Sequence, residues 1–311
     1  MRGEFYFPSK DGNTEIHTIE WKPDGEVKAV LQISHGMLEH AHRYDEFAKF
    51  LAARGFYVVA NDHLGHGKSV QSEAYYGFFH EKYGNTYLIG DMHTLRQRCM
   101  DKYPDIPYFV LGHSMGSILV RQYMQRYGKG LAGVILSGAV SDEATITLQV
   151  GKKICRIVAA CRDWHYCSKF VNSLSFGRYH RKMKSTTSKM SWITGDVEKM
   201  REYLADPLCS FGMSVNGYYH MYDGLLQAKN KVGNQMVPKT LPILLASGAD
   251  DPVGSFGKGV KKISEQYASI GVQDVTLQLY ENGRHEILNE VNRQQVYQDM
   301  YGWLSRKTGE N

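Results

Sequence analysis

Hydrophobic residues along the chain gather in two kinds of pattern, short unbroken runs and longer stretches interleaved with polar residues. The short runs, rich in Val, Ile, Leu and aromatic residues, predict buried parallel strands at Ala29–Ser34, Tyr57–Asn61, Tyr108–Gly112, Gly133–Ser137, Ile243–Ser247 and Val275–Tyr280. Apolar residues that recur every three or four positions predict helices at Tyr44–Arg54, Tyr87–Lys102, Met115–Tyr127, Val260–Ile270 and Arg293–Lys307. Strands that alternate with helices are typical of an α/β fold, a mostly parallel sheet flanked by helices on both faces.

The alternation is interrupted in the middle of the chain. Before it, Glu4–Pro8 and Glu15–Trp21 are strand-like runs separated by a turn-forming stretch, which predicts a hairpin. Residues 141–234 show helical stretches but no clear strand, and the strand pattern resumes at Leu241. We therefore expect one core domain made of residues 1–140 and 235–311, with a helical insertion at residues 141–234.

Ser114 stands in the sequence Gly112-His113-Ser114-Met115-Gly116, a G-x-S-x-G motif between a predicted strand and a predicted helix. On such a turn the serine is held in a strained conformation, and the two glycines remove side chains that would clash where strand and helix approach. Its hydroxyl would lie at the N-terminus of a helix, where backbone N–H groups favour developing negative charge. We expect Ser114 to be a nucleophile.

A nucleophilic serine needs a base and an acid that orients the base, in the chain order Ser, Asp, His. Asp250 and Asp251 follow the strand ending at Ser247, and His285 follows the strand ending at Tyr280, so all three positions meet at one sheet edge. Both aspartates can fill the acid's role. We favour Asp251, because the residue before Pro252 is held extended and is suited to point back toward His285.

An oxyanion hole requires two backbone donors, one after the nucleophile and one after an earlier strand. The first is the N–H of Met115. The glycine-containing turn at His35-Gly36-Met37-Leu38 makes the N–H of Met37 the expected second donor.

The composition and the motifs argue against a signal segment, a membrane span and a metal site. The N-terminus leads directly into mixed polar sequence and no run of twenty apolar residues occurs, which favours a soluble, unsecreted, cytoplasmic protein. The five cysteines form no CxxC pair, and the six-residue steps between Cys155, Cys161 and Cys167 do not match zinc patterns. The histidines near residues 35–66 form no His-Glu-x-x-His motif. We expect no cofactor, no metal and no nucleic-acid partner.

Together these residues resemble a known family. The segments His35–His40 with Arg43-Tyr44, Asp62–Ser69, Gly112–Gly116 and Gly283–Glu286 are similar to those of the monoacylglycerol lipase and lysophospholipase branch of the α/β-hydrolases. The resemblance covers residues 1–140 and 235–311 and implies an α/β-hydrolase fold whose insertion is a cap forming an apolar channel over the serine. It also implies that the substrate is a small-molecule lipid ester with a single acyl chain, cleaved through an acyl-enzyme.

Other functions remain open on the same fold. An aminopeptidase uses the same three residues, although the insertion shows no acidic cluster to recognise an amine. Another acyl hydrolase or a non-catalytic binding protein are further alternatives. Epoxide hydrolases and dehalogenases have an aspartate where Ser114 stands. As for the insertion, we expect a mobile lid whose removal leaves the hydrolysis of short soluble esters intact.

Positive charge is concentrated in the insertion. Residues 141–234 hold 14 Lys and Arg against 8 Asp and Glu, whereas the whole chain has a net charge of +5. Helical spacing predicts Ile154, Ile157, Val158 and Cys161 on one face and Lys152, Lys153 and Arg156 on the other. Two interpretations follow: peripheral contact of the insertion with an anionic membrane surface, or a solvated basic face without a partner.

Overall fold

The computed structural model describes residues 1–183 and 190–309. Eight strands form one sheet: β1 (Arg2–Pro8), β2 (Glu15–Trp21), β3 (Ala29–Ser34), β4 (Phe56–Asn61), β5 (Tyr108–His113), β6 (Gly133–Ser137), β7 (Ile243–Gly248) and β8 (Val275–Tyr280). Their order is β1-β2-β4-β3-β5-β6-β7-β8, parallel from β4 to β8, with β1 and β2 joining antiparallel. The predicted α/β architecture, a mostly parallel sheet with an N-terminal hairpin, is confirmed.

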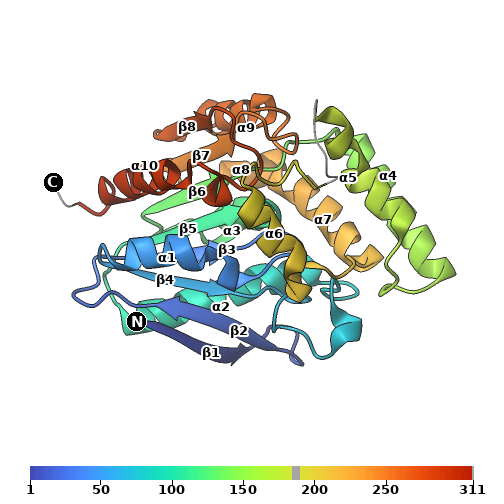
Figure 1. Ribbon diagram of the computed structural model, residues 1–311, viewed down its shortest axis with the longest axis horizontal. Coiled ribbons are helices and arrows are strands. Elements are labelled where there is room, and N and C mark those ends of the chain that lie inside the picture. The colour runs from blue at the N-terminus through green and yellow to red at the C-terminus, as the bar shows by residue number, and fades with distance from the viewer. Residues whose placement is uncertain (184–189, 310–311) are drawn as a thin grey trace.

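Helices cover both faces of this sheet (Figure 1). Side chains of α1 (Asp45–Ala52) and α10 (Arg293–Ser305) pack on one face with Leu31, Ile33 and Leu111. Side chains of α2 (Gly84–Lys102), α3 (Met115–Tyr127) and α9 (Lys258–Ser269) pack on the other, with Val30 and Val110. Neighbouring residues of one strand thus enter opposite layers, and both layers are apolar because parallel strands are buried on both faces.

Between β6 and β7 the described residues form helices and loops. These helices are α4 (Thr145–Cys161), α5 (Lys169–Lys182), α6 (Val197–Ala205), α7 (Val215–Ala228) and α8 (Lys231–Gln235). One short 3-10 helix of this segment is η3 (Pro207–Cys209), and three others lie elsewhere in the chain: η1 (Ala41–Tyr44), η2 (Glu73–Tyr75) and η4 (Ile287–Asn289). Helix α7 packs against α3 and α4, and α4 and α7 lie together beside the sheet in Figure 1. Among the described residues, no helix combines the length and the apolar character needed to cross a membrane.

Candidate active site

The parallel strands bring the predicted site residues to one edge of the sheet. Ser34 of β3 is in register with Gly112 of β5, and His113 is in register with Ser137 of β6. Gly248 of β7 is in register with Tyr280 of β8. The loops that follow these strand ends carry Met37, Ser114, Asp251 and His285.

Ser114 occupies the turn between β5 and α3 and has φ = 51° and ψ = −116°, a conformation that is strained for a residue with a side chain. The flanking glycines are required by close approach. A Cβ on Gly112 would lie 2.4 Å from the carbonyl oxygen of Gly116, and one on Gly116 would lie 2.0 Å from that of Ser34. The tight turn therefore depends on both glycines of the motif.

The loop after β3 lies directly beside this turn. A Cβ on Gly36 would lie 3.1 Å from Cβ of Ser114, which places the next residue, Met37, at the serine as well. Within the described part of the chain, the backbone N–H groups of Met37 and Met115 donate to no acceptor. Two donors are thus available near Ser114.

His285 and Asp251 form a buried pair at the ends of β8 and β7. Nδ1 of His285 lies 3.0 Å from Oδ2 of Asp251, and the ring of His285 lies 4.8 Å, centroid to centroid, from that of His113, the residue before Ser114. A carboxylate only accepts hydrogen bonds, so Nδ1 carries the proton and Nε2 is left as an acceptor. Asp250, the competing aspartate, is exposed.

Electrostatics at this pair favour a basic His285. Burial alone would lower the pKa of His285, but the charge and hydrogen bond of Asp251, with smaller contributions from Glu286 and Glu39, raise it above 6.5. The neighbouring His113 behaves differently, because its burial lowers its pKa to about 4. One of these two adjacent imidazoles is therefore suited to accept a proton near neutral pH, and the other stays neutral.

A buried ionic bridge, absent from the sequence predictions, joins the loop of Met37 to the loop of His285. Arg43 binds both carboxylate oxygens of Glu286 at 2.7 Å and one oxygen of Glu39 at 3.0 Å, while Glu39 accepts the N–H of Gly36. Burial opposes the charge of Glu286, yet Arg43 lowers the pKa of this carboxyl to about 2. The signal that could have found it is the position of Glu286 directly after His285.

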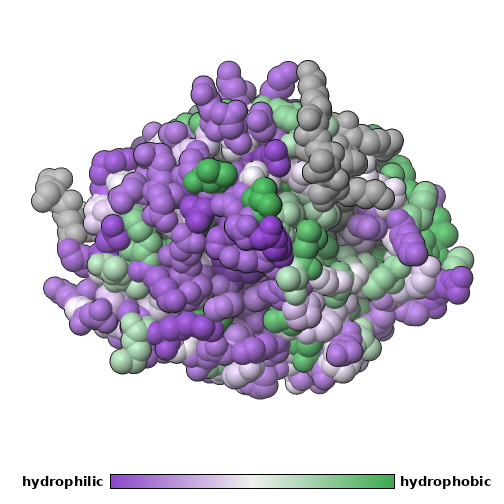
Figure 2. Space-filling model, viewed as in Figure 1, coloured by the Kyte–Doolittle hydropathy of each residue, from purple (hydrophilic) through white to green (hydrophobic). Residues whose placement is uncertain are grey.

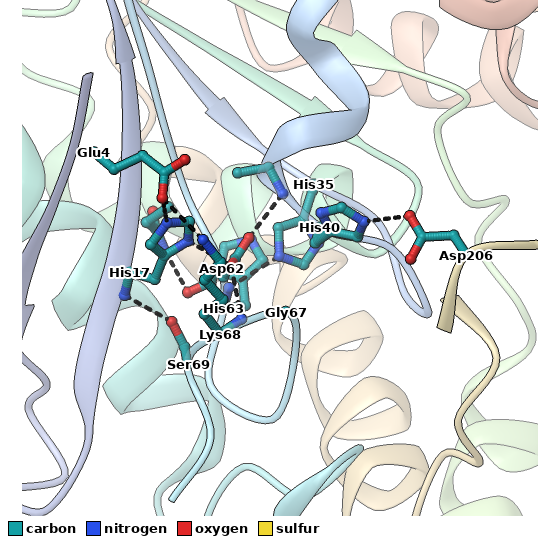
Figure 3. A network of polar contacts seen from close by, with 12 residues as sticks. Glu4, His17, His35, His40, Asp62, His63, Gly67, Lys68, Ser69 and Asp206 are labelled. Atoms are coloured by element: carbon teal, nitrogen blue, oxygen red, sulfur yellow. Dashed lines mark hydrogen bonds and ion pairs between the residues drawn. The ribbon is translucent and has the colours of Figure 1, made fainter. Parts of the chain in front are cut away.

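A second polar network, shown in Figure 3, supports the segment that follows β3. Asp62 accepts the backbone N–H of Ala41 at 2.8 Å and that of Lys68 at 2.9 Å. Nδ1 of His17 lies 2.8 Å from Oδ2 of Asp62, and its Nε2 lies 2.9 Å from Oε2 of Glu4. His17 therefore links β2 to the loop after β4 and to β1. The loop after β4 is thereby fixed to the loop after β3.

The remaining histidines of this region are structural in their contacts. His35, His63 and His66 are buried, and burial lowers the pKa of all three, to about 4 for His35 and about 3 for His66. Nε2 of His35 accepts the N–H of His63 at 2.9 Å. These rings therefore hold backbone in place as neutral groups.

One cluster in the described residues has donor atoms close enough to hold a cation. Ligand atoms of His40, Asp206 and Cys209 lie within 4.8 Å of one another. However, His40 Nε2 is already paired with Asp206 at 2.8 Å, and burial, the largest effect, raises the pKa of Cys209 well above 9, although the charge of Arg43 lowers it. A buried protonated thiol near a guanidinium is a poor ligand.

The predicted faces of α4 are wrong for Lys152, Ile157 and Cys161. Lys152 turns toward α7, where it pairs with Asp223, and its Nζ lies 4.9 Å from the centre of the Tyr219 ring. Arg156 donates to the hydroxyl of Tyr219 at 2.8 Å. Ile157, predicted to lie with the buried residues, is 55% exposed, and Cys161 of the same predicted face is exposed as well. Acceptors on α7, which helical periodicity cannot reveal, draw Lys152 inward, whereas Arg156 remains exposed.

The outward side of α4 carries exposed apolar residues together with Lys153. Ile146, Val150 and Ile157 are at least half exposed, and Lys153 is exposed on the same side. Hydrophobic surface gathers at the right edge of Figure 2, where Figure 1 shows α4. Among the ten basic residues at positions 152–189, Lys184 and Lys189 lie outside the described residues, as do the side chains of Arg178, Arg181 and Lys182.

Comparisons with known proteins identify the family of this chain. Residues 25–292 match the family described as serine aminopeptidase, S33. A monoglyceride lipase from Mus musculus is 30% identical, covering 92% of this chain and 86% of the relative. A carboxyl esterase from Bacillus coagulans, solved with glycerol, superposes with a TM-score of 0.91 at 26% identity, covering 99% of both chains. A lipase described as an open form gives a TM-score of 0.90 at 28% identity over 100% of both chains.

Proposed function

Because the chain belongs to the serine aminopeptidase S33 family, in its monoacylglycerol lipase-like branch of the α/β-hydrolases, we propose that it is a serine esterase acting on lipid esters with a single acyl chain. The protein is a carboxylic ester hydrolase, as its similarity to lipases and to a carboxyl esterase indicates. The proposed substrates are of the monoacylglycerol or lysophospholipid type.

In the proposed mechanism, Ser114 attacks the ester carbonyl while Nε2 of His285 accepts its proton. Asp251 orients His285 and stabilises the imidazolium that forms. The N–H groups of Met37 and Met115 bind the oxyanion. The alcohol leaves with a proton from His285, and a water activated by the same imidazole then releases the acid from the acyl-enzyme.

The observation that carries this proposal is the strained Ser114 at the sheet edge that also holds the His285–Asp251 pair, 3.0 Å apart. An isolated Gly-Ser turn would need neither the positive φ nor a buried imidazole with a raised pKa. We infer that these features serve one reaction centre.

Residues 141–234 are proposed to act as a cap that selects the acyl chain. Helix α7 packs on α3, the helix that begins beside Ser114, so a chain leaving the serine would pass close to the insertion. Its Met213, Tyr218 and Tyr222 are buried, and Tyr219 receives the cations of α4. Much of this aromatic content thus packs the insertion on the core, while Met221 is half-buried.

We further propose that the outward face of α4 contacts a lipid surface. The exposed Ile146, Val150 and Ile157 would enter the headgroup region, with Lys153 close to anionic lipid. Phe170 of α5, the next helix along the chain, is 63% exposed as well. The alternative of a solvated basic face is less favoured, because Lys152 is paired within the protein.

A hydrolysis panel tests the proposed substrate class. p-Nitrophenyl esters of two to sixteen carbons are compared with a monoacylglycerol, lysophosphatidylcholine, and the p-nitroanilides of proline and alanine. We expect turnover of the esters, with a maximum at long chains, and none of the anilides. Faster cleavage of an amino-acyl anilide than of every ester would favour the aminopeptidase alternative.

A further inference from the structure

Residues 191–195 of the insertion, which precede α6, lie against the loop that carries His285. The backbone N–H of His285 donates to the carbonyl oxygen of Trp192 at 3.3 Å, and that of Glu286 donates to Ile193 at 2.8 Å. The indole of Trp192 also lies 5.3 Å, centroid to centroid, from the imidazole of His285. The main chain at His285 is therefore held by residues more than ninety positions earlier in the sequence.

Two side chains of the His285 loop add hydrogen bonds to the backbone of residues 191–195. Arg284 donates from Nη1 to the carbonyl oxygens of Ser191 at 2.7 Å and Thr194 at 3.0 Å. Glu290, which is buried, accepts the N–H of Gly195 at 2.8 Å and the N–H of Arg284 at 2.9 Å through the same oxygen. Arg284 and Glu290 thus clasp residues 191–195 on either side of His285.

We propose that Arg284 and Glu290 are positioning residues, which use residues 191–195 of the insertion to hold His285 in its reactive orientation. The inference rests on the proposed role of His285 as the base. It makes the insertion part of the catalytic framework even for esters too small to reach the cap. A lid that can be removed without effect on short esters, as the sequence led us to expect, is incompatible with it.

The physical reason is the sensitivity of proton transfer to geometry. Among the described residues, the side chain of His285 makes one hydrogen bond, to Asp251, whereas its backbone is fixed by Trp192 and by the clasp. A displacement of about 1 Å at a reacting group can cost about 100-fold in rate. Loss of either clasp residue lets the loop shift relative to Ser114 and Asp251.

Arg284→Ala and Glu290→Ala in the full-length protein test the inference, with p-nitrophenyl acetate as a substrate too short to report on the acyl channel. Arg201→Ala and Glu198→Ala are the matched controls, because this ion pair lies on α6 of the same insertion with both side chains about 70% exposed. We expect kcat to fall about 10- to 100-fold in both clasp variants with KM nearly unchanged, and to stay within twofold of wild type in both controls. Arg284→Lys, which can reach one of the two carbonyls, should recover part of the rate.

A pH profile separates positioning from mere structural support. Asp251, Glu286 and Glu39 are the charged groups that raise the pKa of His285, and His113 beside it is neutral. A loosened His285–Asp251 contact should move the acidic limb of kcat/KM to lower pH, whereas a purely structural tie would lower only the melting temperature. Unchanged kcat and an unmoved limb in Glu290→Ala would overturn the inference, even if Arg284→Ala fails to fold.

His285→Ala in the same assay distinguishes the two levels of the proposal. If it is inactive while the clasp variants match the controls, the positioning role is wrong and the proposed function stands. If it retains activity, the proposed function fails and the positioning role fails with it.

Discussion

Oδ2 of Asp251 lies 3.0 Å from Nδ1 of His285, and the carboxylate is completely buried. Its second oxygen accepts the backbone N–H of Val253 at 2.8 Å, which fixes the orientation of the group. The adjacent Asp250 is exposed, and its backbone N–H donates to Gly283. Two neighbouring aspartates therefore have very different consequences when changed.

Asp251→Asn should lower kcat by about 10³- to 10⁴-fold, because an amide that presents its NH₂ to Nδ1 favours the wrong imidazole tautomer. Asp250→Asn should stay within about threefold of wild type, as expected for an exposed surface change. The measurement is kcat on p-nitrophenyl butyrate, with circular dichroism to verify folding. A more damaging Asp250→Asn would reassign the acid.

The pH dependence of the reaction should follow His285. A base acts only when it is neutral, and its pKa is raised above 6.5 because Asp251 outweighs burial. The value of kcat/KM for an uncharged ester should therefore rise with pH and reach half of its plateau above pH 6.5. In Asp251→Asn the residual activity should have its midpoint at lower pH. A wild-type midpoint below 6.5 contradicts this assignment.

Protein stability should depend on pH through His17. Burial opposes its charge, but Asp62 and Glu4 together raise its pKa above 6.5, so the folded protein retains this proton after the unfolded chain has lost it. This stabilisation is complete below pH 6.5 and is lost as pH rises through the folded pKa. The difference in urea unfolding free energy between wild type and His17→Gln should thus shrink from pH 6 to pH 9. A constant difference would contradict the pairing of His17 with both carboxylates.

Binding to lipid vesicles should depend on α4. We expect the combined change Ile146→Ser, Val150→Ser and Ile157→Ser to lower partitioning at least about tenfold, because each side chain loses apolar area that could be buried. The control is Val232→Ser with Met236→Ser, which removes exposed apolar side chains near α8 instead. Co-sedimentation with anionic and neutral vesicles is the measurement. Equal partitioning of the α4 variant and the control variant would contradict the proposed contact of α4 with lipid.

The sequence was sufficient to predict the strands and the core helices. Val, Ile and Leu runs such as Ala29–Ser34 are found as strands with the expected ends, because burial on both faces leaves a strong pattern. The G-x-S-x-G motif and the two loops after β7 and β8 also lie where parallel strands require them. The preference for Asp251 over Asp250 rests on Pro252 and on the spacing from Gly248.

Contacts between distant segments could not be predicted in the same way. The clasp on residues 191–195 is made by backbone carbonyls and N–H groups, which any sequence supplies. The inward turn of Lys152 depends on Asp223, seventy-one positions later, and helical periodicity cannot predict that partner. Local patterns predict elements, whereas the partners that orient their side chains are set by packing.

Mass spectrometry of the covalent intermediate decides whether Ser114 is the nucleophile. The protein is mixed with an excess of p-nitrophenyl decanoate, quenched in acid within milliseconds to seconds, digested and sequenced by fragmentation. We expect a decanoyl group on Ser114 in wild type, which decays when substrate is exhausted, and no modified residue in Ser114→Ala. Wild-type turnover without acylation of Ser114, or undiminished turnover by Ser114→Ala, would contradict the proposed mechanism.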